Sequence, residues 1–118
     1  MTDTVPDLTP YLAGAASATL EDWGAVKEAT GPAMTQTGVE IWSDGEGASA
    51  GVWESTAGPS FWELAKHEVI HVVAGSMTVT PEGGEAKRIA SGDTAVFPRG
   101  WRGTWDIHET LRKVYIIF

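Results

Sequence analysis

The sequence contains no cysteine, which excludes disulfides, thiolate nucleophiles, zinc–thiolate sites and iron–sulfur clusters together. Basic residues are also scarce: 8 Lys and Arg stand against 16 Asp and Glu, and the formal net charge is −8. Nucleic acids and anionic membranes bind basic patches, so this charge argues against both as partners. No apolar run approaches the roughly 18 residues of a membrane span, and the first ten residues lack a secretory pattern. We therefore expect a cytoplasmic protein.

The sequence is instead rich in glycine, proline and tryptophan, with 14, 6 and 6 of its 118 residues. From residue 37 onward, short runs of β-branched and aromatic residues are separated by Gly, Pro or Asp about every eight to twelve residues. This pattern is typical of short strands joined by tight turns. It predicts an all-β domain that closes into a sandwich or barrel, since closure protects the edge strands.

The N-terminal part follows a different pattern. Residues 1–10 predict a loose arm, and the roughly helical spacing of apolar residues in 11–30 predicts a short helix. We therefore divide the chain into an N-terminal arm or short helix, residues 1–32, and a β-barrel domain, residues 33–118.

Two spaced motifs lie within the predicted barrel. Glu68 is followed by six residues and then Gly75, and Gly92 is followed by five residues, Pro98, one residue and Gly100. In this order, the pair resembles the two motifs of the cupin superfamily. The resemblance implies a double-stranded β-helix, or jelly roll, over about residues 33–118.

Further segments are similar to a small group of cupins that includes ureidoglycine aminohydrolase-like proteins and cupin-type ethanolamine-utilisation proteins. Many members of this group are short and of unknown function. The segments that carry this second resemblance are Gly51–Glu54, Phe61–Glu63, Glu68–Gly75, Gly92–Asp93, Pro98–Trp105 and Glu109–Tyr115.

The metal ligands that the cupin resemblance implies are mostly missing. Histidines would be expected at Phe61 and Glu63, or at Trp62 and Leu64, and a further one at Gly103. Only Glu68 remains on a ligand position, with Glu63 as a second candidate, whereas stable transition-metal sites commonly use three or four ligands. We expect a barrel with no metal or only weak divalent-metal binding, and no cofactor.

The three histidines do not restore such a site. A rearrangement of His67, Glu68 and His71 around a metal is opposed by strand alternation, because Glu68 should point away from both histidines. We expect His67 and His71 to make packing, surface or dimer contacts. His108 falls in a predicted turn over 107–110 and should be exposed.

Glu68 and Lys113 are the candidate catalytic residues. Both lie in strongly apolar runs, and a buried carboxylate needs a cation or hydrogen-bond donors. Two interpretations of Glu68 stay open. It forms a structural pair with Lys113 or Arg112 across the barrel, or it lines a pocket as a general acid or base.

Tryptophan is the best indication of a pocket. Trp105 has the same strand parity as Gly103, a position that the cupin resemblance places at the metal, so Trp105 should face the barrel interior. We expect an apolar pocket with Glu63, Glu68 and Lys113 near its floor. The candidate substrate-binding residues are Trp62, Glu63, Trp105 and Tyr115.

Three functions follow from these features. The first is a stand-alone cupin that binds a small metabolite in the barrel pocket without a standard cupin metal. The second is a metal-dependent enzyme that resembles the aminohydrolases and acts on a small nitrogen-containing metabolite, with the metal at Glu68. The third is a non-catalytic homodimer that pairs through edge strands and the N-terminal arm.

Overall fold

The computed structural model describes residues 4–118, and it contains β-strands and no helix within that range. Every pairing between the strands is antiparallel. The all-β cupin jelly roll predicted from the sequence is confirmed. The strands are β1 (Glu21–Ala25), β2 (Thr35–Ser43), β3 (Ser49–Ser55), β4 (Gly58–Glu63), β5 (Glu68–Pro81), β6 (Lys87–Ala90), β7 (Thr94–Phe97) and β8 (Arg102–Ile117).

The helix expected within residues 11–30 is wrong. Gly14 and Gly24 have φ angles of 64° and 81°, which a right-handed helix does not adopt. Residues 21–25 instead form β1, which pairs with β2 at the edge of the sheet. The division of the chain at residue 32 stays a prediction. In the described residues, no helix is long and apolar enough to cross a membrane.

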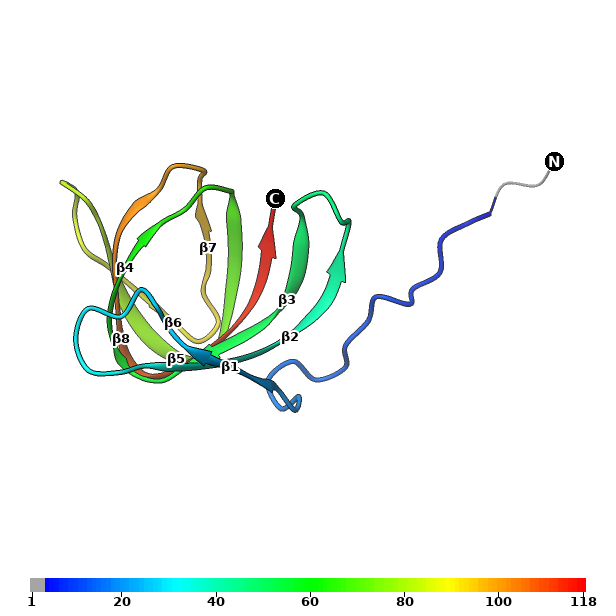
Figure 1. The fold of residues 1–118 in the computed structure, drawn as a ribbon, viewed down its shortest axis with the longest axis horizontal. Coiled ribbons are helices and arrows are strands. Elements are labelled where there is room, and N and C mark those ends of the chain that lie inside the picture. Colours follow the sequence, from blue (N-terminus) through cyan, green and yellow to red (C-terminus); the bar gives the residue numbers. More distant parts are fainter. Residues whose placement is uncertain (1–3) are drawn as a thin grey trace.

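Two long strands, β5 and β8, organise the barrel. They pair with each other from Glu68–Ile117 to Pro81–Gly103. The first part of β5 also pairs with β7 and its second part with β6. Likewise, the C-terminal part of β8 pairs with β3 and its N-terminal part with β4. Each long strand therefore belongs to both walls of the curved sheet seen in Figure 1.

The sequence pattern predicted only short strands, whereas β5 and β8 have 14 and 16 residues. In β5, the pairing register shifts between Val72 and Met77, so the strand bends without ending. Gly75 lies at the bend with a φ of 82°, and a Cβ at this position would collide with the carbonyl oxygen of Thr110. The predicted turn around His108 is also wrong, because His108 lies within β8. Its side chain is exposed, as expected.

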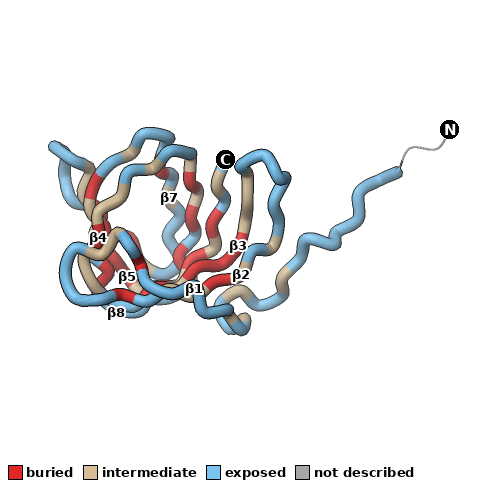
Figure 2. The backbone as a smooth tube through the Cα atoms, in the orientation of Figure 1, coloured by how far each residue is buried: buried red, intermediate tan, exposed pale blue. Residues whose placement is uncertain are grey.

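Alternation along the two long strands gives the barrel its core, and it is interrupted at the bend of β5, where Ser76 and Met77 are both buried. Elsewhere most inward-facing residues of β5 and β8 are buried, while their neighbours are intermediate or exposed (Figure 2). The buried core includes the apolar side chains of Val72, Met77, Val79, Ile107 and Leu111, which do not line the candidate site. The part of the interior that contains the site is lined by tryptophans and by two buried charged groups, Glu68 and Lys113.

Candidate functional site

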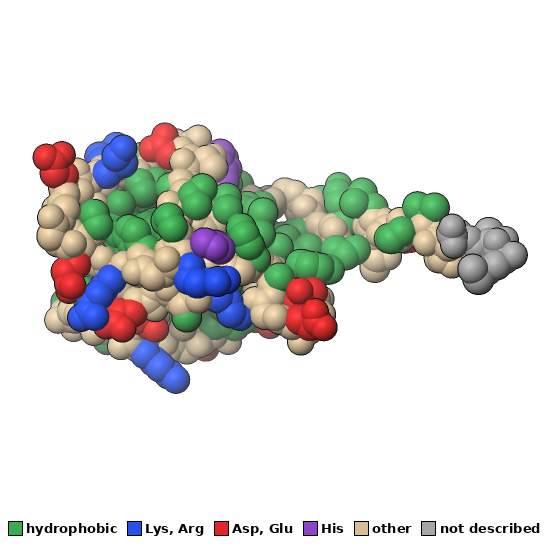
Figure 3. Space-filling model, turned by 90° about the horizontal axis from the view of Figure 1, so that it is seen from above, with side chains coloured by type: hydrophobic (Ala, Val, Ile, Leu, Met, Phe, Trp, Pro, Cys, Tyr) green, Lys and Arg blue, Asp and Glu red, His purple; other side chains and the backbone are tan. Residues whose placement is uncertain are grey.

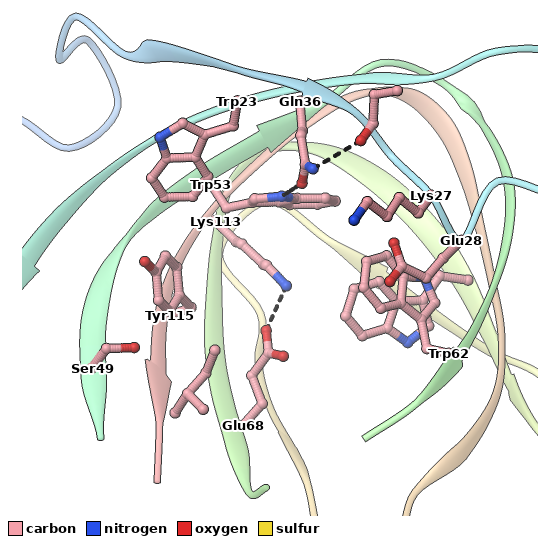
Figure 4. Close-up of a pocket in the computed structure, with 13 residues that line it drawn as sticks. Trp23, Lys27, Glu28, Gln36, Ser49, Trp53, Trp62, Glu68, Lys113 and Tyr115 are labelled. Atoms are coloured by element: carbon pink, nitrogen blue, oxygen red, sulfur yellow. Dashed lines mark hydrogen bonds and ion pairs between the residues drawn. The ribbon is translucent and has the colours of Figure 1, made fainter. Parts of the chain in front are cut away.

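A cavity of about 520 Å³ lies among the tryptophans and the two buried charged groups of the barrel (Figure 4). β8 contributes four lining residues, because alternate residues of this strand face inward: Trp105, Lys113, Tyr115 and Ile117. Neighbouring strands β3, β4 and β5 add Ser49, Trp53, Trp62 and Glu68. The remaining side is covered by residues from β1 to β2: Trp23, Ala25, Lys27, Glu28 and Gln36.

A buried ion pair joins two strands across the cavity. Lys113 Nζ donates to Glu68 Oε2 at 2.5 Å, and both side chains are almost fully buried. Nζ also lies 4.6 Å from the ring centroid of Trp53 and 4.4 Å from that of Trp105. A cation within about 6 Å of an indole face is attracted by the ring quadrupole. The carboxylate and two indole faces together replace the water that Lys113 loses on burial.

This geometry bears on the first of the two interpretations of Glu68, that it forms a structural pair across the barrel. The structural pair across the barrel is confirmed, and its partner is Lys113. Arg112, the other candidate, points outward and pairs with Glu54 through a 2.6 Å contact. An acid or base role for Glu68 stays a prediction.

The tryptophans form a braced aromatic wall. Trp62 stacks on Trp105 with ring centroids 4.5 Å apart, and Trp53 meets both rings edge-on at 6.3 and 6.4 Å. Trp62 Nε1 donates to Ser60 Oγ, and that hydroxyl donates to the Trp105 carbonyl. Trp53 Nε1 donates to Gln36 Oε1 at 2.7 Å. Because these contacts restrict the side chains, the cavity is formed in advance of any ligand.

One donor in this wall has no acceptor. Among the described residues, the buried Nε1 of Trp105 makes no hydrogen bond. A buried donor without a partner costs about 1–3 kcal/mol.

Tyr115 contributes a neutral hydroxyl to the cavity. Burial raises the pKa of this hydroxyl above its ordinary value of 10, and the negative charges of Glu40 and Glu68 raise it further. Its ring lies over Gly51, where a Cβ would come within 2.6 Å of the hydroxyl oxygen. Tyr115 is thus a hydrogen-bonding group that stays protonated at neutral pH.

Five of the six candidate residues line the cavity, and Glu63 does not. The exposed Glu63 carboxylate contacts Arg102 at 3.1 Å on the outside of the barrel. Alternation explains the difference, because Trp62 faces inward and its neighbour Glu63 must face outward. The expectation that both would lie in the pocket overlooked this constraint.

The sequence argument missed several lining residues. Trp53 could have been assigned from alternation in its strand, although the sequence did not show which parity faces inward. The group around Trp23, Lys27 and Glu28 gave no such signal, because that segment was expected to be helical. Its position follows from the pairing of β1 with β2.

The residues do not fit a cupin metal site. A Cβ at Gly103 would collide with the carbonyl oxygen of Thr80, so no histidine side chain fits there without backbone movement. Glu68 already binds Lys113. Across residues 4–118, no group of three or more His, Cys, Asp or Glu side chains could hold a metal ion. His71 lies on the opposite face of its strand from Glu68, as alternation predicted.

Comparison with known families agrees with this architecture. The family model of the EutQ-like cupin domain matches residues 42–115. The chain belongs to the EutQ-like cupin family. This confirms the resemblance to ethanolamine-utilisation-type cupins that the sequence motifs indicated.

Solved structures of this family share the fold at low sequence identity. The Clostridium difficile EutQ protein superimposes with a TM-score of 0.76 at 15% identity, over 95% of this chain and 90% of that one. A putative ethanolamine utilization protein EutQ from Salmonella typhimurium superimposes with a TM-score of 0.66 at 23% sequence identity. The match covers 80% of this chain and 76% of that one.

Similarity extends to cupins of unknown function. A DUF861-family protein from Pseudomonas syringae pv. tomato gives a TM-score of 0.78 at 21% identity over 86% of this chain, which spans only 45% of that protein. Among curated proteins, none matches this chain. These comparisons establish the fold and the family, and they indicate no specific catalytic activity.

Proposed function

We propose that this EutQ-like cupin binds a small, planar metabolite without net charge in its barrel cavity. The observation that carries the proposal is the buried Lys113–Glu68 pair beside the braced tryptophan wall. Five of the thirteen lining residues are aromatic and six carry polar or charged side chains, so apolar surface and convergent polar groups share the cavity, as they do in small-molecule sites.

Charge balance favours an uncharged ligand. Lys113 is neutralised by Glu68, and the other charged residues of the lining, Lys27 and Glu28, are again one cation and one anion. A net charge brought into this interior would lose its hydration without a free counter-ion. A neutral planar group, by contrast, can stack on an indole face of the lining without losing the hydration of a charge.

The metal-dependent hypothesis receives no support from the donor set, and we derive no reaction step from it. An aminohydrolase-like site of that kind needs ligands besides Glu68, and the lining provides only Glu28 as a further carboxylate. The ligand-binding proposal requires no metal.

Ligand screening by thermal unfolding tests the proposal. A panel of neutral amides and heteroaromatic compounds, matched with monocarboxylates and primary amines of similar size, is added to the full chain. We expect a neutral planar compound to raise Tm and to change tryptophan fluorescence. A ligand at 100 times its Kd stabilises by about 2.7 kcal/mol.

Two tryptophan variants provide the matched comparison. Trp62→Ala should abolish the response, because Trp62 lines the cavity, whereas Trp42→Ala on the outside should preserve it. A response restricted to the charged compounds, or one that survives Trp62→Ala, would contradict the proposal. So would a panel without any response.

We also propose that the protein works in the cytoplasm without nucleic-acid or membrane partners. The net charge of −8 opposes binding to other polyanions. A chain without cysteine gains no disulfides from an oxidising compartment. Cell fractionation tests the compartment, and recovery in the membrane or nucleic-acid fraction would contradict the proposal.

A further inference from the structure

Lys113 differs from the other lysines of the chain in its burial. The chain has four lysines, all within the described residues. Lys113 is 3% exposed, whereas the other three are exposed: Lys27, Lys66 and Lys87. On the face of the molecule that Figure 3 shows, Lys and Arg side chains lie at the surface beside Asp and Glu. A lysine amine that is removed from water inside a pocket is the type that enzymes use to react with carbonyl groups.

The cavity brings a ligand close to this amine. Lys113 lines the cavity, and its Nζ lies 4.6 Å from the ring centroid of Trp53 and 4.4 Å from that of Trp105. Figure 4 shows Nζ directed into the space that Trp62 and Tyr115 also border. A flat ligand that stacks against this aromatic lining therefore has its edge beside Nζ.

Glu68 is positioned to exchange a proton with the amine. Its Oε2 already accepts a hydrogen bond from Lys113 Nζ at 2.5 Å. A general acid or base must lie within hydrogen-bond reach of the proton that it transfers, about 2.6–3.2 Å between heavy atoms or closer. Glu68 and Lys113 stand on β5 and β8, which pair directly, so the transfer needs no movement of either strand.

We propose that Lys113 forms a protonated imine with a small planar aldehyde held in the cavity. The assignment rests on the proposed function, the binding of a neutral planar ligand, and it adds the reactive group of that ligand. An aldehyde fits because its carbonyl carbon is uncharged, planar and open to attack by an amine.

The reaction balances with the groups that the cavity contains. The Lys113 ammonium gives one proton to the Glu68 carboxylate, and the electron pair of the neutral amine forms a C–N bond at the carbonyl carbon. The former carbonyl oxygen takes a second proton from this nitrogen and becomes a hydroxyl. The Glu68 carboxylic acid then protonates the hydroxyl, the C–O bond breaks, and water leaves as the nitrogen electron pair forms the C=N bond. Glu68 ends as a carboxylate, and neither an oxidant nor a reductant is consumed.

The protonated imine keeps the positive charge at the place of the ammonium. Glu68 remains its counter-ion, and the rings of Trp53 and Trp105 remain its neighbours. The aldehyde thus enters and reacts without adding a net charge to the cavity. This meets the condition that the charge balance of the lining sets for a ligand.

Trapping with a reductant tests the proposal on the full chain. Benzaldehyde is the probe, and benzamide is the matched neutral planar compound that forms no imine. Sodium cyanoborohydride reduces a protonated imine to a stable secondary amine and leaves a benzyl group on the lysine. Cleavage after glutamate places each lysine in a separate peptide, and Lys113 is the one lysine of residues 110–118. We expect this peptide to carry on the order of ten times the label of the Lys66 or Lys87 peptide, measured by mass spectrometry.

Three variants relate the label to the cavity. Trp62→Ala should lower the label in residues 110–118 several-fold, because it removes a lining ring, whereas Trp42→Ala on the outside should leave the label unchanged. Glu68→Gln removes the proton acceptor and should slow the labelling by about 100-fold. The Tm of each variant is recorded, and the peptide map of the unaltered chain decides the proposal if a variant does not fold.

The outcomes separate this proposal from the proposed binding function. Equal label on all four lysines, or label mainly on the exposed Lys27 of the lining, would overturn the role of Lys113. A rise in Tm with benzamide, without label on Lys113 from benzaldehyde, would overturn the imine and leave the binding function standing. No rise in Tm with either compound, together with no label, would overturn both.

Discussion

The inner and outer faces of β8 reverse the common pattern of a strand in a barrel. Near the C-terminus, the inward positions include Lys113 and Tyr115, and the outward positions include Val114 and Ile116. Lys113 is almost fully buried, whereas Ile116 is about half exposed. A charged group thus lies inside and aliphatic groups lie outside, one and three residues apart on the same strand.

The reversal shows that residue type alone does not decide which face of a strand is inside. The inner face tolerates a cation because Glu68 and two indole rings surround it. On the outward side of β8, Ile116 is half exposed, and no buried partner surrounds it among the described residues. Burial on the inner face therefore depends on the partners that surround a group and not on its polarity alone.

Removal of the buried cation Lys113 should have the largest effect on stability. Lys113→Met leaves the Glu68 carboxylate buried without its partner, which should lower the free energy of unfolding by about 3–5 kcal/mol. The double variant Lys113→Met with Glu68→Leu removes both charges and should recover most of that loss. Urea unfolding measures both effects. A single variant no less stable than the double would show that the pair is not the reason Lys113 is tolerated inside.

Removal of Arg112, a charged residue on the outward side of β8, should lower the free energy of unfolding less than removal of Lys113. Arg112→Gln removes the contacts with Glu54, Ala15 and Ala18, and should cost about 1–2 kcal/mol while releasing the base of the arm. Limited proteolysis before β1 should become faster.

Arg102→Gln is the control for this prediction. Arg102 pairs with Glu63 and Glu82, but all three side chains are well exposed, so its loss should change stability by less than about 1 kcal/mol. Equal losses for the two arginine variants would contradict the claim that Arg112 anchors the arm.

The barrel and part of the cavity lining could be predicted from the sequence, because both depend on local patterns within strands and turns. Alternation in a strand is a local property, so it correctly separated Glu68 from His71 and placed Lys113 and Tyr115 on one face. The same rule, applied to neighbours in β4, would have excluded Glu63. The two spaced motifs identified the family because tight turns restrict which residues can occupy them.

Contacts between distant segments could not be predicted in this way. The cover formed by Trp23, Lys27 and Glu28 depends on the pairing of β1 with β2, and the expected helix concealed it. The outward row of Val96, Val69, Ile116, Ala50 and Trp42 likewise exists only through register across five strands. No single run in the sequence shows that Val96, Ile116 and Trp42 are aligned, because strand register is set by pairing over long separations.

The smallest expected effect concerns the proton of Tyr115. The chain has two tyrosines, so Tyr11→Phe leaves Tyr115 as the single tyrosine to be titrated. Its pKa should lie above 10, because burial and the charges of Glu40 and Glu68 disfavour the tyrosinate. The stability that depends on the protonated hydroxyl is present below pH 10 and is lost as the pH rises through the raised pKa.

Ultraviolet absorbance of the tyrosinate follows this titration. Glu40→Gln, combined with Tyr11→Phe, should bring the pKa part of the way back towards its ordinary value, because it removes the larger of the two charge effects and leaves the burial and the Lys113–Glu68 pair unchanged. Burial is the larger cause, so most of the shift should remain. A return to the ordinary pKa in this variant would show that the inner face acts through charge alone, and that the cavity around Tyr115 is better hydrated than its aromatic lining implies.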